Sequence, residues 1–187
     1  KADCEKILLK YSSENFCTTI IRPATVCGYS IRQRLDVVVN ILTNIAYHKR
    51  EITVFGGKQL RPNIHIDDMV NLYELMINTE KKLINKKAYN VGYDNYPVVE
   101  IATKVKELLG KDIKLKLVPT NDNRSYHISS KKIKDEIGFY PKKNIDDAIH
   151  DLKEAFEKKL IINSLNDPKY FNIEMMKRVN LKWRKNL

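Results

Sequence analysis

The sequence predicts an α/β fold with at least some parallel strand pairing, and two observations lead to this prediction. Short runs rich in β-branched residues alternate along the chain with stretches whose apolar residues recur at helical spacing. The chain has 187 residues, 43% of them hydrophobic, which is enough for one compact domain with its own core. No internal repeat is visible, and no apolar run approaches the ~20 residues that a membrane span needs.

The first part of the chain is expected to alternate between helix and strand. The patterns predict a helix over 2–13, a buried strand over 16–21, a loop over 24–33, a helix over 35–48 and extended pieces over 52–55 and 61–66. Gly56-Gly57, between the last two pieces, is interpreted as a hairpin turn. Asp67 is interpreted as the N-cap of a helix whose apolar face carries Met69, Leu72, Tyr73, Met76 and Ile77.

The second part continues the alternation. It predicts a strand over 88–91, a helix over 98–109 stopped by Gly110, a half-exposed strand over 113–118 and helices over 130–137 and 145–160. Beyond Asn163 the chain is polar and poorly periodic, and Tyr170, Phe171 and Trp183 are the expected anchors onto the body.

The charge and the cysteines limit the possible partners. A net charge of +11 fits either an acidic partner or a lysine-rich solvated surface. The lysines are spread along the helices, without the interleaved aromatics of a single-strand binding groove, so we expect no nucleic acid and no membrane as partner. Cys4, Cys17 and Cys27 lack metal-ligand spacing, which favours reduced thiols and a cytoplasmic protein. No metal site is predicted, because the histidines are isolated from one another and from the cysteines: His48, His65, His127 and His150.

Two arginines stand out in a chain in which lysine dominates. Arg61 follows the Gly56-Gly57 turn, and Arg124 lies in a polar loop before a helix. A guanidinium can grip a phosphate with two parallel hydrogen bonds, whereas a salt bridge to an aspartate at a helix start is the structural alternative. Taken alone, the residues leave these two interpretations even.

Five segments in order carry a family resemblance: KADCEKILLKY, IIRPATVCGYS, ITVFGGKQLRPNIHIDDMV, AYNVG and NRSYHISSKKIKDEIGFYPKKNIDDAI. Together they resemble the carboxyl-terminal half of the NAD-dependent epimerases and dehydratases of nucleotide sugars, which are extended short-chain dehydrogenases/reductases. The resemblance covers residues 1 to about 156. It implies the carboxyl-terminal part of a Rossmann-like domain, interleaved with a small substrate-binding subdomain over 1–163. A polar C-terminal extension would then occupy 164–187.

The resemblance also implies residues that bind NAD or NADP. Lys1, with Glu5 four residues later, matches the lysine of the family's Tyr-x-x-x-Lys signature. That lysine holds the nicotinamide ribose and lowers the pKa of the catalytic tyrosine. The run Pro23, Ala24, Thr25 and Val26 resembles the segment that passes along the nicotinamide. Cys27 is a departure, because the family often has tyrosine there.

A nucleotide-diphosphate sugar is the substrate that the resemblance implies. Thr25, where the family often has asparagine, and the segment with Val39 and Asn40 would contact the sugar and diphosphate. The residues expected at the base and at the diphosphate are Thr53, Phe55, Arg61 and Arg124. Phe55 would stack on the base, and the two arginines would meet the diphosphate.

The family's glycine-rich cofactor unit and catalytic tyrosine would both precede Lys1. The chain is therefore predicted to be a fragment of a nucleotide-sugar epimerase, dehydratase or reductase of surface polysaccharide synthesis, inactive alone. The parent would oxidise a sugar carbon by hydride transfer to the cofactor. Alternatives are a non-catalytic nucleotide-sugar-binding relative and a basic nucleic-acid-binding module, which only the charge supports. A homodimer through the helix expected over 2–13 is possible.

Overall fold

The structure is a computed structural model that describes residues 1–121 and 124–179. Helices and strands alternate along the chain, and their bounds are α1 Ala2–Tyr11, β1 Thr19–Pro23, β2 Thr25–Cys27, α2 Val38–Lys49, β3 Glu51–Phe55, β4 Leu60–His65, α3 Ile66–Asn78, α4 Lys81–Ile84, β5 Lys87–Val91, β6 Asn95–Pro97, α5 Val98–Leu109, β7 Lys114–Val118, α6 Lys131–Ile137, α7 Ile145–Glu157, the 3₁₀ helix η1 Pro168–Tyr170 and α8 Asn172–Arg178. No helix of the described residues is long and apolar enough to cross a membrane.

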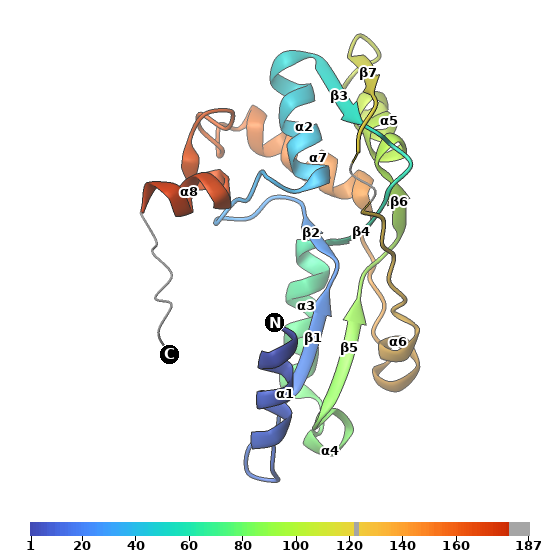
Figure 1. The fold of residues 1–187 in the computed structure, drawn as a ribbon, viewed down its shortest axis with the longest axis vertical. Coiled ribbons are helices and arrows are strands. Elements are labelled where there is room, and N and C mark those ends of the chain that lie inside the picture. The colour runs from blue at the N-terminus through green and yellow to red at the C-terminus, as the bar shows by residue number, and fades with distance from the viewer. Residues whose placement is uncertain (122–123, 180–187) are drawn as a thin grey trace.

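The strands form three small sheets with mostly parallel pairing. β1 pairs with β5, β2 with β4, and β3 with β7, all in parallel, while β6 runs antiparallel to β4. Figure 1 shows an elongated molecule with β1 and β5 toward one end, beside α1 and α3, and β3 and β7 toward the other, beside α2 and α5. Strands β2 and β4 lie between the two ends. The predicted parallel pairing is confirmed.

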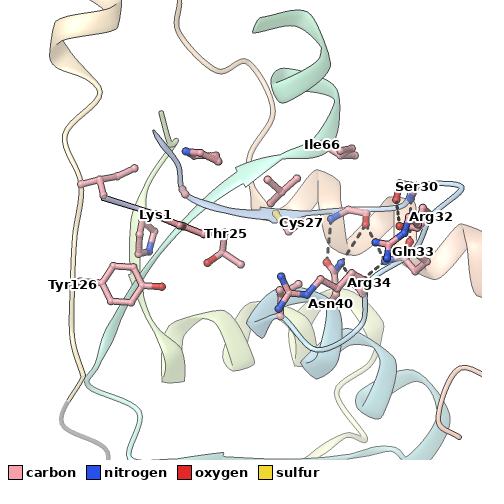
Figure 2. A pocket seen from close by; sticks show the side chains of 17 residues that line it. Lys1, Thr25, Cys27, Ser30, Arg32, Gln33, Arg34, Asn40, Ile66 and Tyr126 are labelled. Atoms are coloured by element: carbon pink, nitrogen blue, oxygen red, sulfur yellow. Dashed lines mark hydrogen bonds between the residues drawn. The ribbon is translucent and has the colours of Figure 1, made fainter. Parts of the chain in front are cut away.

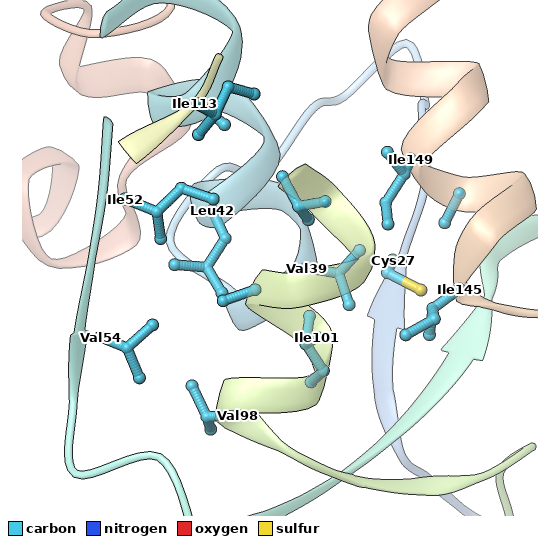
Figure 3. Packing of buried hydrophobic residues seen from close by; sticks show 14 residues of the cluster. Cys27, Val39, Leu42, Ile52, Val54, Val98, Ile101, Ile113, Ile145 and Ile149 are labelled. Carbon is cyan, nitrogen blue, oxygen red and sulfur yellow. The ribbon is translucent and has the colours of Figure 1, made fainter. Parts of the chain in front are cut away.

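Three buried clusters hold these elements together. The largest lies between α2, α5, α7 and β3 and includes Val39, Ile52, Ile101 and Ile149 (Figure 3). A second joins α3, β5 and α6 around Tyr89, which is fully buried. A third packs Leu35 against α7 and the C-terminal Tyr170. Removing this apolar surface from water is the main force that orders the short strands.

Helix α1, like the short helix α8, has no buried residue. Ile7 and Tyr11, predicted on its apolar stripe, are 57% and 66% exposed. Its tie to the sheet is Glu5, whose carboxylate accepts two hydrogen bonds from the Arg22 guanidinium at 2.5 and 3.0 Å. This contact raises the pKa of Arg22 and lowers that of Glu5.

Two local predictions are wrong. Gly56-Gly57 does not close a hairpin, because β3 pairs with β7 whereas β4 pairs with β2 and β6. The two glycines, at φ of 78° and 108°, instead form a turn that the Gln59 side chain closes. Asp67 is not the N-cap of α3: His65 is, and its Nδ1 accepts the Asp67 N–H at 3.1 Å.

Other differences are smaller. The predicted loop over 24–33 contains strand β2, and β6 was not predicted. On the α3 face Met69, Leu72 and Met76 are buried as expected, but Tyr73 and Ile77 are exposed. Tyr170 and Phe171 do anchor the C-terminal segment, which includes α8, while Trp183 lies outside the described residues.

Candidate functional site

A cavity of about 560 Å³ opens where β1 leads into β2. Its lining includes several residues that the sequence predicted: Lys1, Pro23, Ala24, Thr25, Val26 and Asn40. The cavity therefore lies at the carboxyl end of β1, whose parallel partner β5 ends beside it at Val91. In α/β folds the carboxyl edge of parallel strands is where ligands bind.

Figure 2 shows the two sides of this cavity. Lys1, Thr25 and Tyr126 lie on one side, and the loop with Ser30, Arg32, Gln33 and Arg34 lies on the other. The Glu5–Arg22 pair ties the first turn of α1 to β1, which brings Lys1 to the cavity edge. Segments from α1, β1, β2 and α2 thus meet at one place.

The buried amide of Asn40 holds the 28–34 loop closed. Its Oδ1 accepts the Gly28 N–H at 3.1 Å, while its Nδ2 donates to the Arg34 carbonyl at 2.8 Å and to the Gly28 carbonyl at 3.4 Å. Gln33 also donates to the carbonyls of Gly28 and Arg34, at 3.3 and 3.1 Å. Asn40 therefore shapes the cavity wall through backbone contacts.

The electrostatics of the cavity favour an anionic ligand. Lys1, Arg32 and Arg34 line it, and no aspartate or glutamate is found among the described lining residues. Arg34 pairs with Asp36, which does not line the cavity, so the lining itself presents only cationic and neutral groups, which suit a phosphate-bearing ligand. Cys27 adds no nucleophile, because burial raises the pKa of its thiol to about 12.

The two predicted diphosphate arginines contact each other, but neither is among the residues that line the cavity. Arg61 Nη1 donates to the Arg124 carbonyl at 2.6 Å and to the Leu60 carbonyl at 2.9 Å. The Arg61 guanidinium also stands 5.4 Å from the centre of the Tyr126 ring, and Tyr126 lines the cavity. Arg61 therefore touches one cavity-lining residue, Tyr126, and its role at a diphosphate stays a prediction.

Three other predicted substrate residues do not line the cavity. Val39 is fully buried in the largest cluster, although its neighbour Asn40 reaches the cavity. Thr53 and Phe55 lie on β3, which pairs with β7 at the far end of the molecule (Figure 1). Phe55 is 59% exposed at the end of that strand.

His65 lies beside two acidic side chains, a neighbourhood that the sequence did not predict. Its buried ring places Nε2 at 3.0 Å from an Asp151 carboxylate oxygen, and Asp67 lies beside its Nδ1. These three side chains could in principle ligate a metal. Lys143 contacts both carboxylates, at 2.6 Å for Asp67 and 3.7 Å for Asp151, and so offsets part of their negative charge.

Sequence reasoning missed Arg32 and Arg34, the two arginines that line the cavity. It singled out Arg61, which follows a turn, and Arg124, which lies in a polar loop. The signal for the missed pair was available: two arginines spaced by one residue, in a loop between a strand and a helix, in a chain rich in lysine. Tyr126, which follows Arg124, was also missed.

Comparisons with known proteins agree with this geometry. A model of the NAD dependent epimerase/dehydratase family matches residues 1–92, which include α1, the cavity loop and β5. Among solved structures, the chain is similar to a UDP-glucose 4-epimerase from Thermotoga maritima with UDP-glucose, at 25% identity and a TM-score of 0.72. That match covers 86% of this chain and 52% of the epimerase.

Two dehydratases share the fold. A dTDP-glucose 4,6-dehydratase from Bacillus anthracis, in complex with NAD, matches at 20% identity and a TM-score of 0.70, over 84% of this chain and 50% of that one. A dTDP-glucose 4,6-dehydratase from Streptomyces venezuelae, with NAD and TYD bound, matches at 16% and 0.72, over 89% and 52%. The chain thus spans about half the length of the structures it matches.

These likenesses confirm the predicted fold class, the α/β architecture of part of a Rossmann-like extended short-chain dehydrogenase/reductase. The segments that carried the resemblance form the helix, strands and cavity loop described above. By its sequence match over residues 1–92 and by this fold, the chain is similar to the NAD-dependent epimerase/dehydratase family.

Proposed function

We propose that this chain is the substrate-binding half of an NAD(P)-dependent nucleotide-sugar epimerase, dehydratase or reductase, and that its cavity takes a nucleotide-diphosphate sugar. The observation that carries the proposal is the gathering of Lys1, Arg32 and Arg34 around one cavity without an acidic lining residue. A diphosphate is the part of such a substrate that needs this charge.

The residues at the mouth of β1 fit a nicotinamide cofactor. Pro23, Ala24, Thr25 and Val26 form one side of the cavity as an extended backbone, along which a flat ring can lie. Lys1 brings its ammonium to the same cavity, where it can donate to ribose hydroxyls. A bound nicotinamide would supply the hydride acceptor; Lys1 orients it, and the arginines hold the substrate.

Alone, the chain is expected to bind a nucleotide sugar and to turn nothing over. The cofactor's phosphates need a glycine-rich turn at a helix N-terminus, and no such turn follows a strand in this sequence. A role in surface polysaccharide synthesis, a cytoplasmic location and a homodimer stay predictions that belong to this proposal.

Isothermal titration of the 187-residue chain tests the proposal. UDP-glucose, dTDP and GDP are titrated separately at about 150 mM salt, where long-range electrostatics are screened. We expect saturable binding of at least one nucleotide, lost in Arg32→Gln and kept in the matched control Arg50→Gln, whose guanidinium pairs with Asp112 and does not line the cavity. NAD alone should bind weakly.

The alternatives have distinct outcomes. One outcome would favour a non-catalytic nucleotide-sugar-binding relative. In that case this chain binds a nucleotide, the coding sequence upstream of Lys1 encodes an unrelated segment, and the complete protein turns over no nucleotide sugar. No nucleotide binding, together with an affinity for DNA that falls steeply as salt is added, would favour the nucleic-acid module. Turnover of a nucleotide sugar by this chain with NAD would refute the expectation of inactivity.

A further inference from the structure

Asp36 joins the cavity loop to the C-terminal segment. One of its carboxylate oxygens accepts a hydrogen bond from Arg34 Nε, and the other accepts the backbone N–H of Asn172 at 3.0 Å. Arg34 lines the cavity, whereas Asn172 is the first residue of α8. A single carboxylate therefore connects an arginine of the site to a helix 136 residues further along the chain.

The adjacent residue strengthens this connection. The Leu35 N–H donates to the Tyr170 carbonyl at 2.8 Å, and both side chains are buried in the same apolar cluster. Residues 34–36 therefore contact residues 168–178, which we call the C-terminal brace, on the side of the loop that faces away from the cavity. The cavity-lining face of the loop remains available to a ligand.

The C-terminal brace is itself anchored. The Tyr170 hydroxyl donates to the Ile162 carbonyl at 3.1 Å. Just before the brace, the buried Ser164 hydroxyl contacts Asn44 Oδ1 at 2.6 Å and His48 Nε2 at 2.9 Å, both on α2. Helix α2 also carries Asn40, which bonds the 28–34 loop directly. The loop is therefore held both by α2 and by the C-terminal segment that packs on α2.

We propose that Asp36 is a positioning residue, which aims Arg34 at the anionic part of the ligand, and that the C-terminal brace sets the affinity of the cavity for that anion. The proposal rests on the proposed function for the identity of the ligand. Asp36 engages Nε of Arg34, so the terminal nitrogens of the guanidinium are left to face a phosphate.

Charge alone predicts the opposite effect of removing Asp36. Deleting a negative charge near a bound diphosphate would by itself tighten binding, and added salt would reduce this gain. If the Arg34 guanidinium lost its orientation toward the phosphate, a charge-assisted hydrogen bond would weaken and the affinity would fall about tenfold. Positioning therefore predicts a net loss of affinity, and a bare charge effect predicts a gain.

The first experiment measures the brace without any ligand. Hydrogen exchange of the 187-residue chain is followed by mass spectrometry in Asp36→Ala and in the control Asp112→Ala, which removes another Arg–Asp pair, with Arg50. We expect faster exchange in peptides covering 28–36 and 168–178 in Asp36→Ala alone. If exchange in both peptides were unchanged in Asp36→Ala, the proposal that Asp36 connects the loop to the C-terminal brace would be wrong.

The second experiment measures positioning with UDP, UMP and uridine as probes. Asp36→Ala should weaken UDP about tenfold and leave uridine unchanged, and Asp36→Glu should restore part of the loss. Arg34→Gln should cause a similar loss, and the double variant Asp36→Ala/Arg34→Gln no further loss, because both act through one guanidinium. Equal losses for all three probes, additive losses or tighter UDP binding would overturn the positioning role.

The outcomes keep the two proposals apart. If the wild-type chain binds none of the nucleotides, the proposed function fails and so does the positioning role of Asp36, while the exchange experiment still decides the brace. If the wild type binds UDP and Asp36→Ala binds it equally well, only the positioning role fails.

Discussion

At the scale of single residues, the wall of the cavity depends on amide geometry more than on charge. Asn40 is buried, and its side chain satisfies one N–H and two carbonyls of the 28–34 loop. We expect Asn40→Ala to lower the free energy of unfolding by ~1–3 kcal/mol, because these backbone groups lose their partner. Urea unfolding measures this loss.

A matched pair of variants shows whether the amide itself matters. Asn40→Asp should be worse than Asn40→Ala, because a carboxylate oxygen would then face two carbonyl oxygens. The exposed Asn78 of α3 is the control, and Asn78→Ala should change stability by less than about 0.5 kcal/mol. An Asn40→Asp variant as stable as the wild type would contradict this interpretation of the loop.

Cys27 gives a prediction in pH. Burial raises the pKa of its thiol from 9.0 to about 12, so the fold favours the neutral thiol. The unfolded chain ionises near pH 9, and stability from this group is therefore present below that pH and lost as pH rises from about 9 to 12. The loss should be smaller in Cys27→Ala, although burial also raises the pKa of Tyr89, to about 12; urea unfolding at several pH values measures the difference.

The same burial protects the thiol. At pH 8 we expect iodoacetamide to modify exposed Cys4 first, and Cys27 only after unfolding. Mass spectrometry of the alkylated peptides measures the order. Rapid alkylation of Cys27 in the folded chain would show that the cavity admits reagents to its sulfur.

At the scale of elements, the close approach of β2 to β4 requires a glycine. Gly28 has a φ of 101°, and a Cβ there would meet His65 Nε2 at 3.0 Å and Ile66 Cγ2 at 3.3 Å. We expect Gly28→Ala to destabilise the fold by ~2–4 kcal/mol, because left-handed strain and a steric contact with a buried ring add together. Thermal unfolding monitored by circular dichroism measures this.

Gly138 provides the comparison for Gly28. Its φ of 74° is also left-handed, but a Cβ there would meet nothing within 4 Å. Gly138→Ala should therefore cost only the backbone strain, about 1 kcal/mol. If Gly28→Ala and Gly138→Ala lowered the free energy of unfolding equally, the contact with His65 would contribute nothing to the loss.

Elements with a local stop signal were the ones that the sequence predicted best. The helix expected over 98–109 has those bounds in α5, because its apolar spacing is regular and Gly110 follows it. Partner choice between strands was not predictable: the pieces around Gly56-Gly57 look like a hairpin locally, but β3 instead pairs with β7, some 60 residues further along the chain. His65 became the cap of α3 through a nitrogen acceptor, which no capping rule based on oxygen side chains anticipates.

The candidate site divides in the same way. Family motifs located Lys1 and the Pro23–Val26 run, which do line one cavity. They did not locate Arg32 and Arg34, because the position of that loop depends in part on the C-terminal brace, which Asp36 contacts 136 residues further along the chain.

At the scale of the whole molecule, the excess of positive charge should make stability depend on salt. The formal net charge is +11, and many of the described acidic side chains already contact a lysine or arginine. Because positive charges are in excess, added salt weakens the repulsion between them more than it weakens the ion pairs. The melting temperature should therefore rise by a few degrees between about 10 and 150 mM NaCl. Calorimetry measures this, and a fall would mean that the ion pairs dominate.

The unburied helix α1 also affects how the molecule opens. A helix of ten residues without buried side chains can unwind while the rest of the protein stays intact, so its amides should exchange at a far lower opening free energy than those of α5. Lys1 stands at the N-cap of this weakly held helix. Any surface that covers Ile7 and Tyr11 would slow that local opening and so keep the Lys1 ammonium at the cavity for a larger share of the time.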